Sequence, residues 1–377
     1  MKCHSEFRIH NWIVLSLILP TFNESENLPE LLPKIRSALS PIPHEIIIVD
    51  DDSPDHTWKV AQELAEKLGD VHVIRRIGRR GLSSAVIEGF LATKGDVLAV
   101  MDADGQHDTG LLAKLHEAVH KQGGIAIGSR YIEGGSVGEW DERRYLLSRV
   151  ATKMALSLCA VKAKDPMSGF FAIDRKVFEE VLPRLNPKGF KILLDLLVHV
   201  PRSTAVTELP FTFATRKHGE SKLSRRVQLE FLEYLYDVSI GNWIPLTFVK
   251  YCIVGGLGVG VHLTAYLLLS KMFAQGLPLS LMGFSLALLG AIETAIIFNF
   301  WLNNMWTFVH AKLQGLALIP GFLKYNFACA FGALANYAVS TYLYSHGLGE
   351  IISVIIGACA GIIWNYTMSR MFAWKNA

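Results

Sequence analysis

The sequence lacks a cysteine framework. Its 377 residues contain five cysteines and no Cys-x-x-Cys pair (Cys3, Cys159, Cys252, Cys329 and Cys359). Three of these cysteines lie in apolar runs, where a free cysteine behaves as a small hydrophobic residue. We therefore expect neither a set of disulfides nor a zinc site.

The chain also lacks a strong excess of positive charge. The formal net charge is +3, which excludes the basic footprint typical of nucleic-acid-binding proteins.

A secretory signal is not predicted either. The apolar segment 12–20 is too short and ends in a turn residue, so we interpret it as a first strand.

Charged residues are scarce in the last part of the chain. Residues 246–377 contain six basic and two acidic residues, whereas residues 1–245 contain 31 basic and 32 acidic ones. A charge-rich segment of ordinary domain size therefore precedes a charge-poor tail.

The tail is composed of long apolar runs. They cover about 251–269, 277–300, 316–344 and 351–369. Each approaches the ~20 residues that cross a bilayer as a helix, so we predict four transmembrane helices rather than a buried core of a soluble protein. Lys and Arg cluster before the first span, between the second and third spans and after the fourth span. The positive-inside rule then predicts a cytoplasmic soluble domain and C-terminus.

The tail also repeats itself, which predicts two helix hairpins of common ancestry. The similar pairs are 248–268 with 322–343, and 299–308 with 365–374. Glycines in the first span would let helices approach closely; they are Gly255, Gly256, Gly258 and Gly260. Glu293 is the acid inside a span. Two interpretations stay open, a functional carboxylate or one hydrogen-bonded to Asn299 or another helix.

The first part of the chain alternates strand-like and helical segments. The strand-like runs are 13–20, 45–51, 71–76, 96–104 and 124–130, and the helical stretches lie near 26–39, 54–68, 82–93 and 109–122. This alternation predicts a mostly parallel sheet with helices on both faces. Ligands of such sheets bind beyond the carboxyl ends of the strands.

Acidic residues gather at two of these strand ends. In VMDADGQHD (100–108), Asp102, Asp104 and Asp108 fall within seven residues, a pattern that favours a hard divalent cation. We expect Asp108 to act as a helix cap and His107 not to be a ligand. In VDDDSPD (49–55), we expect Ser53 to cap the next helix, which leaves Asp50 and Asp51 without an assigned role.

Two further segments have alternative interpretations. GRRGLSSA (78–85) is either a phosphate-binding loop or a helix start served by the hydroxyls of Ser83 and Ser84. The segment 221–243 pairs basic with apolar residues at helical spacing, which predicts an interfacial helix. The segment 191–200 is either a second interfacial helix or a helix packed on the sheet.

Several motifs resemble those of known enzymes. PTFNE (20–24), VDDDSPDHT (49–57), GRRGLSSA and DADGQH (102–107) together resemble family-two glycosyltransferases with the GT-A fold. Four later segments resemble dolichol-phosphate (polyprenyl-phosphate) mannose synthases; they are 128–149, 165–173, 188–197 and 208–223. The tail resembles the GtrA-type four-helix domain. Ser83 departs from the family pattern, which has glycine there.

The resemblance implies a domain organisation. An α/β GT-A (Rossmann-like) catalytic domain would occupy 1–220, an interfacial helix and linker 221–245, and a four-helix transmembrane domain in two hairpins 246–377.

The resemblance also implies roles for individual residues. Asp102, Asp104 and Arg130 would be the catalytic residues. A divalent metal, Mg²⁺ or Mn²⁺, would be bound by Asp104 and Gln106 together with Asp102, for which binding to the donor ribose is the alternative. The donor nucleotide would contact Pro20, Phe22, Glu24 and Asp51, and Arg216 and Lys222 would close over the phosphates. The acceptor phosphate would be bound by Arg130, Arg144 and Ser148. For Arg225 and Arg226, a basic patch on the membrane surface is the better interpretation.

The implied reaction is transfer of mannose from GDP-mannose to dolichyl or another polyprenyl phosphate, with inversion to a β-mannosyl phospholipid. One alternative is UDP-glucose, or another nucleotide sugar, with the same acceptor. A second is a lipid-binding or translocating protein with a regulatory soluble domain. A processive polysaccharide synthase is disfavoured because a QxxRW-like motif is absent from the sequence.

Overall fold

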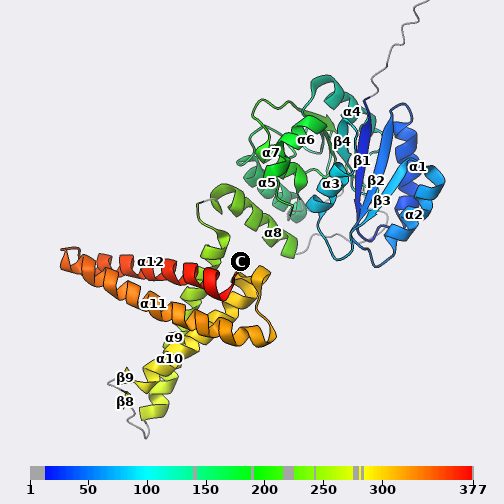
Figure 1. Cartoon of the computed structure of the whole chain (residues 1–377). Coiled ribbons are helices and arrows are strands. Elements are labelled where there is room, and N and C mark those ends of the chain that lie inside the picture. The colour runs from blue at the N-terminus through cyan, green and yellow to red at the C-terminus, as the bar shows by residue number, and fades with distance from the viewer. Residues whose placement is uncertain are drawn as a thin grey trace, which may run out of the picture. The chain divides into compact units, whose positions relative to one another are not determined.

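The computed structural model describes residues 13–138, 142–187, 191–214, 225–241, 243–274, 280–281 and 284–375, with only the backbone described at 142–147, 225–228, 230, 273–274, 280–281 and 284–285. The chain divides into two compact units, Met1–Ser239 and Ile240–Ala377. Figure 1 shows both units with their helices and strands labelled.

The first unit is an α/β domain around a seven-stranded sheet. The strands are β1 (Leu15–Thr21), β2 (His44–Asp50), β3 (Val71–Arg75), β4 (Val97–Val100), β5 (Ile125–Ser129), β6 (Phe171–Asp174) and β7 (Val206–Pro210). Their order is β3-β2-β1-β4-β6-β5-β7. β6 is antiparallel to β4 and β5, and the other pairs are parallel. The predicted mostly parallel sheet is confirmed.

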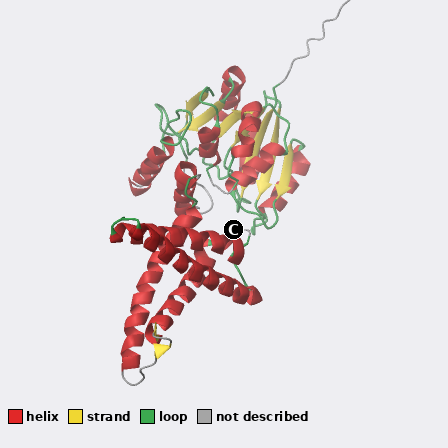
Figure 2. Ribbon diagram, turned by 60° about the vertical axis from the view of Figure 1, so that its left-hand side comes forward, coloured by secondary structure: helices red, strands yellow, loops and turns green. Residues whose placement is uncertain are grey.

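Alternate residues of the buried strands face opposite sides of the sheet, as strand geometry requires. Leu17 and Leu19 of β1 face a core completed by α1 (Leu28–Leu39), α2 (Thr57–Leu68) and α4 (Leu111–Gln122). Ile18 faces a second core completed by α3 (Leu82–Leu91), α6 (Arg175–Val181) and α7 (Ile192–His199). Helices therefore cover both faces of the sheet (Figure 2).

Two amphipathic segments have different surroundings. In α7, the residues from Ile192 to Leu197 are all buried, so the interpretation of 191–200 as an interfacial helix is wrong. In α8 (Arg225–Tyr236), Phe231 and Leu235 pack against Ala155 of α5 (Glu142–Leu156). Other α8 positions, including Leu229 and Leu232, are exposed. An interfacial role for α8 stays a prediction.

The second unit contains four helices that are long and apolar enough to cross a membrane, as predicted. They are α9 (Leu246–Ala274), α10 (Leu286–Leu302), α11 (Leu318–Ser345) and α12 (Glu350–Met368). α9 packs mainly on α10, and α11 packs mainly on α12, which makes the two predicted hairpins. A short strand pair, β8 (Ser280–Leu281) and β9 (Phe284–Ser285), lies between α9 and α10.

The internal repeat appears in the local structure. α10 and α12 each continue into a π-helical turn at equivalent positions, Asn303–Thr307 and Ser369–Ala373. The residue after each turn is aromatic, and the rings of Phe308 and Trp374 stack with 4.6 Å between their centroids. Equivalent residues of the two hairpins therefore meet in one aromatic core.

Glycine contacts are also repeated. A Cβ atom at Gly258 would clash with the side chain of Asn299, and one at Gly332 would clash with that of Asn365. Gly255, Gly256 and Gly260 have no such neighbour within 4 Å, so the predicted close approach holds only at Gly258 among these four glycines. Small residues thus bring the helices of each hairpin together.

Glu293 is hydrogen-bonded to another helix. Asn326 of α11 donates to both of its carboxylate oxygens, at 3.2 and 3.0 Å. Asn299, the other predicted partner, lies against Gly258 instead. This contact links the two hairpins, which supports the structural interpretation of the intramembrane acid.

Candidate functional site: the carboxyl edge of the sheet

The predicted site residues lie at one edge of the sheet. β1, β2, β4 and β5 run in the same direction, so their carboxyl ends lie together, and the antiparallel β6 begins at this edge. Pro20 lies in β1, and Asp51, Asp102 and Arg130 directly follow β2, β4 and β5 or lie within two residues of them. Segments far apart in the sequence therefore contribute to one site.

Asp50 organises the end of β2. Its carboxylate accepts hydrogen bonds from the Thr21 hydroxyl at 2.9 Å and from the Ser53 hydroxyl and backbone N–H at 2.6 and 2.9 Å. Asp55 caps α2 by accepting from the backbone N–H of Thr57 at 3.0 Å. The prediction that Ser53 caps this helix is wrong, because its hydroxyl is used by Asp50 at the strand end.

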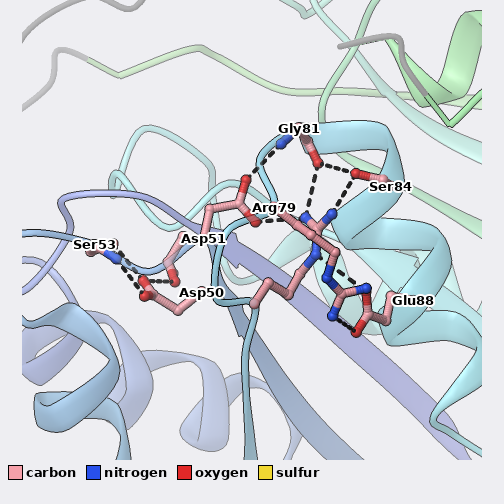
Figure 3. A network of polar contacts seen from close by, with 9 residues as sticks. Asp50, Asp51, Ser53, Arg79, Gly81, Ser84 and Glu88 are labelled. Atoms are coloured by element: carbon pink, nitrogen blue, oxygen red, sulfur yellow. Dashed lines mark hydrogen bonds and ion pairs between the residues drawn. The ribbon is translucent and has the colours of Figure 1, made fainter.

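Asp51 connects the end of β2 to the basic loop that follows β3 (Figure 3). One carboxylate oxygen accepts from the buried Arg76 guanidinium at 2.6 Å, and the other accepts from the backbone N–H of Gly81 at 2.7 Å. Burial raises the pKa of Asp51, and the bonds from Gly81 and Arg76 oppose that shift. Asp51 thus has a structural role, which is to hold Arg76 and Gly81, and its predicted nucleotide contact stays a prediction.

The loop GRRGLSSA is held by several side-chain contacts. Arg79 pairs with Glu88 at 2.9 Å, and the Arg80 guanidinium lies 4.6 Å from the centre of the Phe22 ring. The Ser84 hydroxyl donates to the carbonyl of Gly81 at 2.9 Å at the start of α3. The helix-start interpretation therefore applies to Ser84. The contact of Arg80 with Phe22 joins this loop to the predicted nucleotide residues.

Glu24 completes this side of the edge. It is buried, and its carboxylate accepts from the Asn27 side chain at 2.7 Å. Its backbone N–H donates to the Thr57 hydroxyl at 2.9 Å, which fixes the loop after β1 against α2. The predicted nucleotide residues Pro20, Phe22 and Glu24 are therefore all placed by the β1 end and its loop.

The segment after β4 places the predicted metal ligands. Asp104 is buried, and one of its carboxylate oxygens accepts from the backbone N–H of Gln106 at 3.1 Å. The Gln106 side-chain nitrogen donates to the carbonyl of Ala214 at 2.8 Å. Asp102 is half-buried and touches the position of Gly169.

His107 packs among aromatic rings, and Asp108 has the capping role that we expected. The His107 ring lies 5.0 to 5.6 Å from the rings of Phe170, Phe211 and Phe213, and burial lowers its pKa. It is therefore a neutral packing residue. The carboxylate of Asp108 accepts from the backbone N–H of Gly110 at 2.9 Å, just before α4 begins.

The donor set after β4 fits a divalent cation shared with phosphate groups. Carboxylates are hard oxygen ligands, and Mg²⁺ often uses only one or two of them beside substrate phosphates. The described residues contain no group of three or more His, Cys, Asp or Glu side chains that could enclose a metal by themselves. Asp102 and Asp104 with Gln106 therefore suit an ion that is completed by its substrate.

Arg130, a predicted acceptor residue, is held by a buried carboxylate at the end of β5. Its Nε and Nη2 atoms each lie 2.8 Å from an oxygen of Asp165, whose side chain has no solvent exposure. The backbone N–H of Arg130 also donates to Asp165, at 3.0 Å. Hydrogen bonding and charge from Asp165 outweigh burial and raise the pKa of Arg130. This bidentate pair fixes the plane of the guanidinium.

α5 lies beside this arginine. The Ser148 hydroxyl is 2.8 Å from the Tyr131 hydroxyl, and the Arg149 guanidinium lies 5.4 Å from the Tyr131 ring centre. Ser148 is therefore brought next to Arg130 in the fold. The side chains of Arg144, Arg216 and Lys222 lie outside the described residues, as do those of Arg225 and Arg226.

Two charged residues at this edge were missed by sequence reasoning. Asp165 binds Arg130, and Lys191 donates to the carbonyl of Met167 at 3.2 Å. Burial lowers the pKa of Lys191 to about 8, with a smaller lowering from Arg130 that Asp102 and Asp165 oppose. Both residues lie in motifs that carry the family resemblance. The available signal was a lysine directly before an apolar helix.

Gly169 is required by its distance to Asp102. A Cβ atom there would lie 2.7 Å from an Asp102 oxygen. We expect Gly169→Ala to displace this carboxylate and reduce the rate of the sugar transfer that the sequence resemblance implies about 10- to 100-fold, because small displacements of reacting groups are costly. Steady-state rates measure this effect. Gly110→Ala is the control, because its Cβ would meet only the exposed Asp108 carboxylate, at 3.2 Å. Equal rates for the two variants would contradict the prediction.

Comparisons with known proteins agree with this architecture. Residues 16–182 match glycosyl transferase family 2, and residues 250–374 match the GtrA/DPMS transmembrane domain. The chain is 40% identical to the dolichol-phosphate mannosyltransferase of Pyrococcus furiosus over 96% of this chain and 99% of that protein. It is 38% identical to the Saccharomyces cerevisiae dolichol-phosphate mannosyltransferase over 60% of this chain and 88% of that protein. It is 39% identical to the polyprenol monophosphomannose synthase of Mycolicibacterium smegmatis over 55% of this chain and 80% of that protein.

The fold, the strand-end site and these matches define a glycosyltransferase that is integral to a membrane. The chain belongs to glycosyl transferase family 2, in the group of the dolichol-phosphate mannosyltransferases with a GtrA/DPMS transmembrane domain. The resemblance inferred from its motifs is thereby confirmed.

Proposed function

We propose that this enzyme transfers mannose from GDP-mannose to dolichyl or another polyprenyl phosphate on the cytoplasmic side of a membrane. The observation that carries the proposal is the Arg130–Asp165 pair, which lies at the sheet edge close to Asp102. Asp165 occupies the Nε and Nη2 edge of Arg130 and thereby holds the guanidinium, a group suited to phosphate binding, in a fixed plane. The relatives named above support mannose as the sugar and a polyprenyl phosphate as the acceptor.

A phosphate acceptor simplifies the chemistry. The second pKa of a phosphate monoester is ~6, so the acceptor is mostly a dianion at neutral pH. Its oxygen attacks the anomeric carbon of the sugar while the bond from that carbon to the donor phosphate breaks. No proton moves in this step. The site therefore needs cations that position two anions rather than a general base, and the buried neutral His107 is not used.

This mechanism assigns tasks to the residues at the edge. Arg130, with Arg144 and Ser148, would position the acceptor phosphate. Pro20, Phe22, Glu24 and Asp51 would bind the nucleotide, and Arg216 and Lys222 would cover the phosphates. A single in-line attack inverts the anomeric carbon, so an α-linked donor would give a β-mannosyl phospholipid.

A divalent metal completes the donor side. Mg²⁺ or Mn²⁺ held by Asp102, Asp104 and Gln106 would offset the negative charge that develops on the leaving diphosphate. The oxygen-rich donor set after β4 supports this assignment.

The orientation follows from the charges that flank the spans. Basic residues precede the first span and follow the fourth, as the positive-inside rule expects for cytoplasmic segments. The active site would then open to the compartment that supplies nucleotide sugars.

The test is a product assay with the purified full chain. The protein is incubated with a polyprenyl phosphate, Mg²⁺ or Mn²⁺, and either GDP-mannose or UDP-glucose, and the lipid is analysed by mass spectrometry. We expect a mannosyl-phosphate lipid that disappears when a chelator is added. A glucosyl product would keep the mechanism and reject the donor. Absence of product from folded protein with several lipid lengths would favour lipid binding or translocation.

A further inference from the structure

The residue Lys191 lies where the donor and acceptor sides of the site meet. It directly precedes α7, whose first residues Ile192, Leu193 and Leu194 are buried in the domain core. The start of α7 is therefore fixed in position. The Lys191 ammonium donates to the carbonyl of Met167 at 3.2 Å.

The loop 165–169 connects Lys191 with both sides of the site. At one end, Asp165 forms the bidentate pair with Arg130. At the other end, Gly169 lies against the carboxylate of Asp102. Met167, which accepts from Lys191, lies between these two residues in the same loop. Lys191 is thus near Arg130, Asp102 and Asp165, and it interacts electrostatically with all three.

Two cations held close together in a buried site repel each other. Arg130 has 10% of its side chain exposed, and its charge opposes that of Lys191. Asp102 and Asp165 offset this repulsion in part, but Asp165 is already bound by the Nε and Nη2 atoms of Arg130, and Asp102 is a predicted metal ligand. A phosphate dianion bound between the two cations would stabilise both of them, because an opposite charge nearby favours the charged form.

We propose that Lys191 is a further substrate-binding residue, which contacts the acceptor phosphate together with Arg130 and offsets the repulsion between acceptor and donor anions. This inference rests on the proposed function, since it names a second cation for the same phosphate acceptor. It also explains why a lysine, rather than an apolar residue, precedes the buried helix α7.

The test compares neutral variants of Lys191 in the full-length enzyme. Lys191→Met removes the charge and the hydrogen bond to Met167, whereas Lys191→Gln removes the charge and retains a donor group. For both variants, we expect kcat/KM for polyprenyl phosphate to fall about 10- to 100-fold, the range for loss of a charged hydrogen bond. The KM for GDP-mannose should change by less than about 3-fold. Lys191→Arg should recover part of the loss because it restores the charge.

The control is Lys176→Met, at an exposed position in α6. Its kinetic constants should equal those of the wild type, and thermal unfolding should show that Lys191→Gln is folded. Wild-type kinetics for Lys191→Gln would overturn the inference, as would equal losses in the constants for lipid and donor. Failure of the wild-type enzyme to use GDP-mannose and polyprenyl phosphate would instead reject the proposed function, which keeps the two failures distinct.

Discussion

Replacement of Asp104 with alanine should reduce sugar transfer by at least ~100-fold, the scale seen when one group that stabilises developing charge is removed. Asp104 is a buried carboxylate in the turn after β4, and it accepts a hydrogen bond from the backbone N–H of Gln106. Its loss would remove a hard oxygen ligand, and a water molecule in its place would not be held as rigidly. The measurement is the rate of lipid glycosylation across a titration of Mg²⁺ and Mn²⁺.

Asp108→Ala is the matched control for this experiment. Asp108 lies in the same acidic segment but is exposed and bonds to the backbone of Gly110. We expect its rate to stay within about 3-fold of the wild type, because surface changes of this kind are usually small. Substantial turnover by Asp104→Ala at every metal concentration would reject the ligand role of Asp104.

The second large effect is expected on stability. Asp165→Ala should lower the free energy of unfolding of the α/β unit by about 3–5 kcal/mol, because it leaves the guanidinium of Arg130 without its buried carboxylate. The pair is almost fully removed from solvent, with 10% of the Arg130 side chain exposed and none of that of Asp165. Thermal and denaturant unfolding of the full-length protein in detergent would measure the shift in the transition of this unit.

A surface pair provides the comparison. Arg36 and Asp70 also lie 2.8 Å apart, but their side chains are 38% and 26% exposed. Asp70→Ala should therefore cost less than about 1 kcal/mol. In addition, Arg130→Met should recover much of the stability when it is combined with Asp165→Ala, since the unpaired buried charge is then absent. Similar losses for Asp165→Ala and Asp70→Ala would show that burial does not strengthen the first pair.

Local sequence patterns were sufficient for the architecture. Apolar runs such as that of β1, separated by helical segments, predicted the mostly parallel sheet. This was possible because the spacing of apolar residues that distinguishes strands from helices is a property of neighbouring residues. Span length and scarcity of charge predicted the four membrane helices. The acidic segment containing Asp102 and Asp104 pointed to the carboxyl edge of the sheet, where the structure brings the predicted site residues together, because parallel strands carry their carboxyl ends to the same side.

Capping and burial were less predictable. Serine is a residue type that favours helix caps, but the hydroxyl of Ser53 donates to the carboxylate of Asp50, three residues earlier. The segment that became α7 is apolar throughout, and this composition suits a membrane surface and a protein core equally well. The choice depended on which elements packed against it.

What the sequence by itself determined is the class of protein, the two-part organisation and the strand ends at which the predicted site residues lie. The tertiary structure decided the partners of the charged groups. β6 runs antiparallel between β4 and β5 and brings the preceding loop between their carboxyl ends. Asp165 thereby meets Arg130, 35 residues away in the chain, and Lys191 reaches Met167. No local period encodes such contacts, because they arise only when distant strands pair and bury the charges between them.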